Sequence, residues 1–111
     1  MRREDGVYLQ HMLGMSRKAL ELANGKSAGD FDSDEVLRLA LRHLLQIVGE
    51  AASRVSPEFR ASSPEIPWDE IIGMRHRVVH DYMGIDEEIV WKTIAEDLPA
   101  LVEILEGRLS G

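Results

Sequence analysis

The sequence predicts an all-α protein, an antiparallel up-and-down bundle of four main helices. Apolar residues recur at spacings of three and four along most of the 111 residues, as they do on one face of an amphipathic helix. No convincing run alternates between apolar and polar side chains with the period of two that marks a β-strand. Short connections separate the periodic segments, which favours antiparallel neighbours in a bundle.

The first expected helix runs from about Asp5 to Asn24. Gly25 follows it and provides a stop, because glycine adopts the left-handed conformation without a Cβ penalty. The next residues, 25 to 33, are polar and rich in glycine, and we expect them to form a connection. The apolar positions of this helix are Tyr8, Met12, Met15, Ala19 and Leu22.

The second expected helix begins with Ser33 as its N-cap, followed by two acidic residues that complement the helix dipole. Gly49 and Ala52 are small enough to permit close approach of another helix, within the core or across a dimer. Val36, Ala40 and Ile47 widen the apolar face, so the helix should be covered on more than one side. Its main stripe is Leu37, Leu41, Leu44, Val48, Ala51 and Val55.

The segment from 56 to 67 contains three prolines and predicts a surface loop, since proline interrupts regular helix. Pro67 suits the first position of a third helix, which should end near Met83 and Gly84. The residues that we expect this helix to turn inward are Trp68, Ile71, Ile72, Val78 and Val79.

A fourth helix should begin after Asp86 as its N-cap, with two glutamates in the first turn. Pro99 should kink this helix or split it in two, because proline lacks the backbone donor that a helix interior needs. The expected apolar positions are Ile89, Val90, Ile94, Leu98, Leu101, Val102 and Leu105.

Length and composition limit the possible classes of protein. A chain of 111 residues predicts a single domain spanning residues 1–111. With 30% charged residues and neither a long apolar stretch nor a signal peptide, we expect a cytoplasmic protein without membrane contact. The absence of cysteine excludes disulfides, thiolate metal sites and cysteine catalysis. The net charge of −7 argues against broad nucleic-acid binding but allows a local basic site.

The segment from Met74 to Gly84 concentrates two arginines, two histidines and a tyrosine within eight residues near the end of the third helix. RNA cleavage requires proton loss from the ribose 2′-OH, proton gain by the 5′-oxygen and stabilisation of the phosphorane charge. Histidine can transfer either proton near neutral pH, and arginine offers a charged fork that fits phosphate oxygens. Arg75 and His80 thus indicate phosphodiester transfer without metal.

Residues 75 and 80 would not face each other on a regular helix, because five residues separate them by ~140° and ~7.5 Å along the axis. Either the helix is distorted here or a second copy completes the site. We favour a homodimer, which would also supply two histidines, one for each proton transfer.

The arrangement Arg75, four residues, His80, one residue, Tyr82 resembles the Arg-x4-His-x-Tyr signature of the HepT-like RNase toxins in the HEPN superfamily. The resemblance extends from about Val7 to Leu105. Its surroundings include Gly49-Glu50-Ala51-Ala52, Pro67-Trp68, Gly84-Ile85-Asp86, Ile89-Val90-Trp91 and Asp97-Leu98-Pro99.

The resemblance implies an HEPN-like helical bundle that acts as a dimeric endoribonuclease toxin, with Arg75 and His80 as the catalytic pair and no cofactor. His76 and Arg77 would position the RNA substrate, although the family often has Asn where this chain has His76. The implied partner is a minimal nucleotidyltransferase antitoxin, as in type VII-like toxin–antitoxin pairs. This antitoxin adenylylates the motif tyrosine, and Tyr82 is the matching position.

Other interpretations of these residues remain open. Arg75 and His80 could be structural, with the arginine paired to Glu50 on the second helix, and Tyr82 could be a packed aromatic residue. His76 and His80 have the spacing of metal ligands on one helix face, but the neighbouring arginines would repel a dication. The bundle could also be a non-catalytic module that docks a nucleotidyltransferase.

Overall fold

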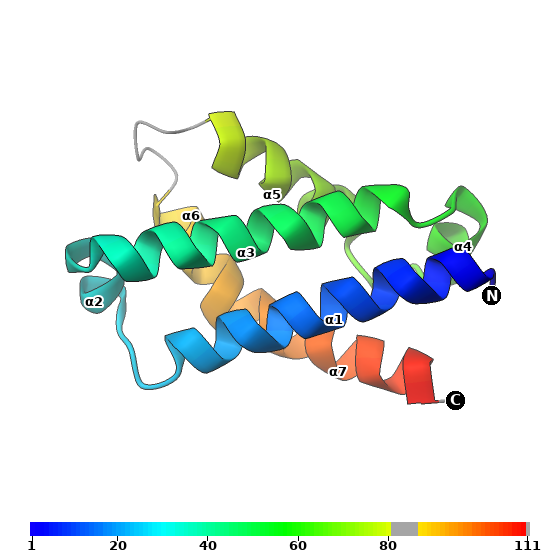
Figure 1. The fold of residues 1–111 in the computed structure, drawn as a ribbon, viewed down its shortest axis with the longest axis horizontal. Helices are drawn as coiled ribbons and strands as arrows, with labels where there is room; N and C mark the ends of the chain where they lie inside the picture. Colours follow the sequence, from blue (N-terminus) through cyan, green and yellow to red (C-terminus); the bar gives the residue numbers. More distant parts are fainter. Residues whose placement is uncertain (81–86, 111) are drawn as a thin grey trace.

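The computed structural model describes residues 1–80 and 87–110, except for the side chains of residues 76–80. All regular elements in this described part are helices, so the all-α prediction is confirmed (Figure 1). In chain order they are α1 Arg3–Ala23, α2 Ala28–Ser33, α3 Glu35–Arg54, α4 Pro57–Ser62, α5 Trp68–His80, α6 Glu87–Lys92, the π-helical η1 Thr93–Asp97 and α7 Leu98–Ser110.

The four long helices α1, α3, α5 and α7 alternate in direction, as an up-and-down bundle requires (Figure 1). α3 lies between α1 and α5 and packs on both, while α7 packs on the other side of α1. In the described part of the chain, α5 and α7 do not pack along each other. The bundle is therefore open between these two helices.

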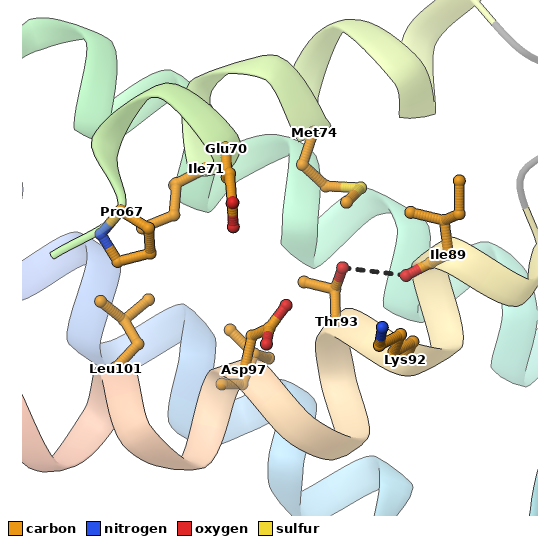
Figure 2. Close-up of a pocket in the computed structure, with 10 residues that line it drawn as sticks. Pro67, Glu70, Ile71, Met74, Ile89, Lys92, Thr93, Asp97 and Leu101 are labelled. Carbon is orange, nitrogen blue, oxygen red and sulfur yellow. Dashed lines mark hydrogen bonds between the residues drawn. The ribbon is translucent and has the colours of Figure 1, made fainter.

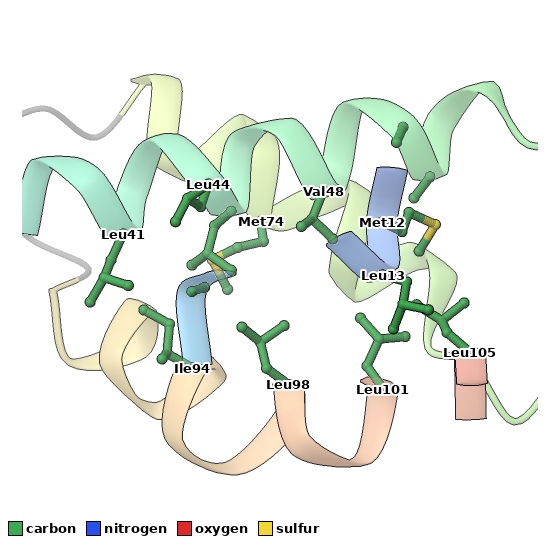
Figure 3. Packing of buried hydrophobic residues seen from close by; sticks show 14 of the residues in the cluster. Met12, Leu13, Leu41, Leu44, Val48, Met74, Ile94, Leu98, Leu101 and Leu105 are labelled. Atoms are coloured by element: carbon green, nitrogen blue, oxygen red, sulfur yellow. The ribbon is translucent and has the colours of Figure 1, made fainter. Parts of the chain in front are cut away.

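The predicted apolar stripe of α3 is confirmed, because all six of its residues are buried (Figure 3). The flanking Val36 is not covered, since 78% of it is exposed, whereas Ala40 and Ile47 are half-buried. The prediction for α1 is partly wrong, because Leu22 is exposed and Tyr8 and Met15 are only half-buried. The apolar residues of α1 that are buried are Leu9, Met12, Leu13 and Ala19.

The expected connection at residues 25–33 contains the short helix α2. The Ser27 side chain accepts a hydrogen bond from the Asp30 backbone N–H, and the Asp30 carboxylate accepts one from the Ser27 backbone N–H. This capping box stabilises a helix start that apolar periodicity does not reveal. The cap of α3 is Asp34, whose carboxylate accepts from the backbone N–H of Leu37, so the prediction of Ser33 was wrong by one residue.

The predicted surface loop at 56–67 contains another short helix, α4. Ser56 caps it by accepting from the backbone N–H of Phe59, and Pro57 occupies its first turn, where a missing N–H costs nothing. Proline thus begins this helix instead of preventing it. After it, the Trp68 ring N–H donates to the Ser63 carbonyl, 3.0 Å away, and fixes the start of α5.

Pro99 divides the predicted fourth helix, as expected. α6 is followed by the π-helical turn η1, in which the backbone N–H of Leu98 donates to the Thr93 carbonyl five residues earlier. Proline has no N–H and crowds the carbonyl four residues before it, so a widened turn relieves that conflict. The predicted cap Asp86 and the predicted helix end at Met83 and Gly84 lie outside the described residues, as do the side chains of Val78 and Val79.

A buried carboxylate joins α1 to the corner between α3 and α4. Only 3% of Asp5 is exposed. Its oxygens accept hydrogen bonds from the backbone N–H of Ser56 at 2.8 Å and from the Ser56 hydroxyl at 2.6 Å. Burial raises the pKa of Asp5, but the two hydrogen bonds from Ser56 and the positive charges of Arg2 and the N-terminus together lower it.

We expect Asp5→Ala to lower the free energy of unfolding by about 2 kcal/mol at neutral pH, because the ionised carboxylate makes two buried hydrogen bonds. Since the folded pKa lies below the unfolded value, this stabilisation is present above the unfolded pKa and is lost as pH falls through the folded pKa. Urea unfolding from pH 7 to 3 should show the parent and variant converging below about pH 4. The matched control is Glu4→Ala, which removes an exposed acid from the same helical turn. A constant difference across this pH range would contradict the assignment.

Candidate functional site

The motif found in the sequence lies at the C-terminal end of α5. Arg75 has an exposed side chain, and the backbones of His76, Arg77 and His80 continue the same helix. The side chains of these last three residues, and all of Tyr82, lie outside the described residues. The structure therefore places the motif from Arg75 to His80 on a helix, and the predicted roles of its members stay predictions.

α5 is a regular α-helix from Trp68 to His80, without a π or 3₁₀ turn at the motif. The sequence suggested that Arg75 and His80 could meet if this helix were distorted, and the structure shows no such distortion up to His80. With regular geometry the two residues are directed ~140° apart around the helix axis. The backbone positions 75 and 80 thus lie on different sides of α5.

Gly49 brings α3 and α5 into close contact at the motif. A Cβ atom built on Gly49 would lie 2.5 Å from the Arg75 Cβ and 2.9 Å from the Ile71 carbonyl oxygen. Both distances are shorter than a normal non-bonded contact, so only glycine fits with the two helices at this spacing. The sequence left open whether Gly49 permits close helix approach within the core or across a dimer. In the structure, this close approach occurs within one chain. It also fixes the position of the Arg75 backbone against α3.

The predicted ion pair between Arg75 and Glu50 does not occur in this structure. Glu50 is half-buried on α3, and Arg75 is exposed on α5. Among the side chains that the structure describes, the ion pairs join other residues: Arg2 with Glu58, Arg17 with Glu106, Arg42 with Glu87, and Arg108 with Glu65. Arg75 is thus exposed and is not paired with a carboxylate of the described part of its own chain.

Arg42 and Glu87 form an ion pair that sequence reasoning missed. Arg42 lies on α3 and Glu87 is the first residue of α6, so the pair joins two helices that are far apart in the sequence. The two side chains are only 15% and 18% exposed, whereas those of the other three pairs are 39–69% exposed. Of the four ion pairs of the described residues, the Arg42–Glu87 pair is therefore the least exposed to solvent.

A pocket of about 460 Å³ occupies the open side of the bundle between α5 and the α6–η1–α7 segment (Figure 2). Its walls are mainly apolar, with Glu70, Asp97 and Lys92 as charged groups and Thr93 hydrogen-bonded to the Ile89 carbonyl at 2.9 Å. Two carboxylates and one ammonium group make it a poor phosphate site. The other lining residues are Pro67, Ile71, Met74, Ile89, Leu98 and Leu101.

The described residues contain no group of three or more His, Asp or Glu side chains able to hold a metal ion. The spacing of His76 and His80 suggested a pair of metal ligands, but the side chains of these two residues are not described, so that possibility is not tested. His11 and His43 are both exposed and lie on different helices, α1 and α3. Both are therefore surface residues.

The sequence pattern of the HepT-like ribonucleases matches residues 12–107, a range that contains the whole motif. The chain belongs to this family. Its relatives include a candidate RNase of Caldanaerobacter subterraneus subsp. tengcongensis, which is 39% identical over 85% of this chain and 84% of the relative. A protein of Thermococcus cleftensis named as a probable ribonuclease HepT is 34% identical over 91% of this chain and 92% of its own.

A third relative, a candidate RNase of Methanocaldococcus jannaschii, is 30% identical over 95% of this chain and 96% of its own length. The similarity thus covers nearly the whole length of both proteins, and the predicted family is confirmed. No solved structure matches the chain significantly. In the described part of the chain, none of the helices has the length and apolar character needed to cross a lipid bilayer.

Proposed function

We propose that this HepT-like protein is a metal-independent endoribonuclease with Arg75 and His80 as its catalytic pair. Membership of the HepT-like ribonuclease family supports the reaction class. Arg75 is exposed and takes part in none of the ion pairs of the described residues, which supports its availability for a phosphate group. Arginine keeps its charge at all physiological pH values and can bind two phosphate oxygens at once.

In the proposed reaction, neutral His80 removes the proton from a ribose 2′-OH, and the 2′-oxygen attacks the adjacent phosphorus. The bond from phosphorus to the 5′-oxygen breaks, and a protonated histidine gives that oxygen its proton. The products are a 2′,3′-cyclic phosphate and a free 5′-OH. Arg75 stabilises the negative charge of the phosphorane, and His76 and Arg77 position the RNA strand.

The observation that carries the proposal further is the regular α-helical geometry of α5 through His80. It directs Arg75 and His80 to different sides of one helix, which favours a homodimer whose two copies of α5 together form each active site. A two-fold dimer presents the same surface from both copies, so the two motif helices can meet across the axis. It would also supply a second histidine for the second proton transfer.

As the biological role, we propose the toxin of a type VII-like toxin–antitoxin pair that acts in the cytoplasm. A minimal nucleotidyltransferase antitoxin would transfer AMP to Tyr82, two residues after His80. The added AMP brings bulk and negative charge next to a site that must accept an RNA phosphate. Repulsion between like charges then opposes substrate binding.

The test is cleavage of an end-labelled RNA by the purified protein in EDTA, after mass spectrometry has shown that Tyr82 is unmodified. We expect cleavage without metal, products with a 2′,3′-cyclic phosphate, and a ~10²–10⁴-fold lower rate for His80→Ala, since general acid–base catalysis contributes a factor of this size. His43→Ala, which changes an exposed histidine on α3, is the matched control. Cleavage that requires magnesium, or that survives His80→Ala, would contradict the proposal. No cleavage of several RNAs would favour a binding module instead.

A further inference from the structure

α3 contacts the helices on both sides of the motif, at two positions that share one face. Gly49 packs against Arg75 of α5, and Arg42 pairs with Glu87 of α6. Arg42 and Glu87 are 45 positions apart in the sequence. Arg42 and Gly49 are two helical turns apart, which places them on the same side of α3 at a distance of ~10 Å along its axis. The helix that carries the motif and the helix that follows it are thus held by the same surface.

The Arg42–Glu87 pair is largely enclosed, and an enclosed ion pair is weak evidence for a role in stability alone. Its side chains are 15% and 18% exposed. The second oxygen of Glu87, Oε2, is buried and accepts no hydrogen bond from the residues that the structure describes. Removing charges from water is costly, and apolar residues of similar size often stabilise a protein equally well. An enclosed pair instead fixes the relative position of the elements that it joins, as paired charges do in some other proteins.

We propose that Arg42 and Glu87 are positioning residues for RNA cleavage, which hold the start of α6 in a fixed place relative to the motif on α5. The inference rests on the ribonuclease function proposed above. One side of the motif is fixed by the Gly49–Arg75 contact, and the ion pair fixes the other side. Neither Arg42 nor Glu87 touches the RNA in this proposal. They act through the relative placement of α5, which ends at His80, and α6.

A pair with this role should affect the rate of the chemical step more than substrate binding. A displacement of about 1 Å at a catalytic group, caused by a change elsewhere, can lower a rate ~10²-fold. Binding of RNA to the exposed Arg75 depends less on the start of α6. We therefore expect loss of the pair to lower kcat by at least ~10-fold, with little change in KM.

The variant for the test is Arg42→Met/Glu87→Met. Removing both charges avoids the unpaired buried charge that either single change would leave, so the double variant should fold. We expect the double variant to have the circular dichroism spectrum of the parent and a kcat at least ~10-fold lower. Arg42→Lys retains a positive charge for the contact with Glu87 and should keep most of the parental kcat.

The matched control is Arg17→Met/Glu106→Met, which removes an interhelical ion pair between α1 and α7. It should leave kcat unchanged. A kcat within two-fold of the parent for the Arg42/Glu87 double variant, or an equal loss in the control, would overturn the proposal.

A second measurement does not depend on activity. Hydrogen–deuterium exchange of peptides covering residues 74–80 and 87–92 should be faster in the Arg42/Glu87 double variant and unchanged in the control. If the parent does not cleave RNA, the proposed function fails, and with it the effect on kcat. The exchange measurement then tests whether the ion pair holds these helices in place. Faster exchange in the double variant supports this role, and unchanged exchange overturns it.

Discussion

Mixing two inactive variants, Arg75→Ala and His80→Ala, should restore RNA cleavage that neither shows alone. Each single variant should be inactive for a different reason. Loss of Arg75 removes the charge that stabilises the phosphorane and should cost ~10²–10³-fold. Loss of His80 removes a proton-transfer group and should cost ~10²–10⁴-fold.

Restoration is expected because α5 directs residues 75 and 80 to different sides of a regular helix. In the proposed dimer, Arg75 of one copy works with His80 of the other. A mixed dimer of the two variants then contains one site with both residues and one site with neither. Half of the dimers are mixed after random exchange, and each has one site of two that contains both Arg75 and a His80, so at most roughly a quarter of the parental sites can act. The mixed dimer has only one His80, so water must complete the second proton transfer and the restored rate should lie below this fraction.

The measurement is cleavage of end-labelled RNA after the two variants are co-refolded at equal concentrations. Arg75→Ala mixed with Arg75→Ala/His80→Ala is the control, because no combination of these two chains contains a His80 and an Arg75 together. A mixture that stays inactive although mass spectrometry detects mixed dimers would contradict catalysis across the two-fold axis. It would place each catalytic pair within one chain.

Gly49→Ala should destabilise the protein by about 2 kcal/mol and also lower RNA cleavage by up to ~10²-fold. Alanine normally stabilises a helix by ~1 kcal/mol relative to glycine. Here the added methyl group would lie 2.5 Å from the Arg75 Cβ and 2.9 Å from a backbone oxygen of α5. Backbone atoms cannot rotate away as the end of a side chain can, so α5 must shift as a whole and carry Arg75 with it.

The two effects are measured by urea unfolding and by the initial rate of RNA cleavage under conditions where the variant remains folded. Gly14→Ala is the matched control, since a Cβ atom at this position of α1 would meet nothing within 4 Å. It should increase stability by up to ~1 kcal/mol and leave the cleavage rate unchanged. If Gly49→Ala behaved like Gly14→Ala, the close contact of α3 and α5 would have no role in stability or in the site.

The long helices could be predicted because their cores follow a repeating local pattern. The stripe of α3 from Leu37 to Val55 is buried throughout, as its spacing indicated. Val36 was misjudged because spacing shows which side of a helix is apolar, not where its covering partners end. The short helices α2 and α4 escaped prediction because end caps, at Ser27 and Ser56, stabilise them without an apolar stripe.

The site was predictable only to the extent that it is local. Arg75 and its neighbours stand out because their charges are concentrated in one stretch of an acidic chain. The Arg42–Glu87 pair and the pocket beside Met74 depend on how distant helices meet, and nothing in the spacing of these residues indicates that they are close. The pair predicted for Arg75, with Glu50, followed from their charges and their neighbouring helices, but opposite charge alone does not determine contact.

The π-helical turn at Thr93–Asp97 also limits how the length of this chain can change. A π turn holds one residue more than the α-helical turn that it replaces, which is equivalent to a single inserted residue. Everything after it is rotated by about 100° relative to a continuous α-helix. Leu101 and Leu105 are buried in the present register. Deleting one residue within this turn would therefore restore a continuous α-helix and keep the apolar face of α7 on α1. Deleting one residue from a regular turn of α7 before Leu101 would instead turn that face away from α1.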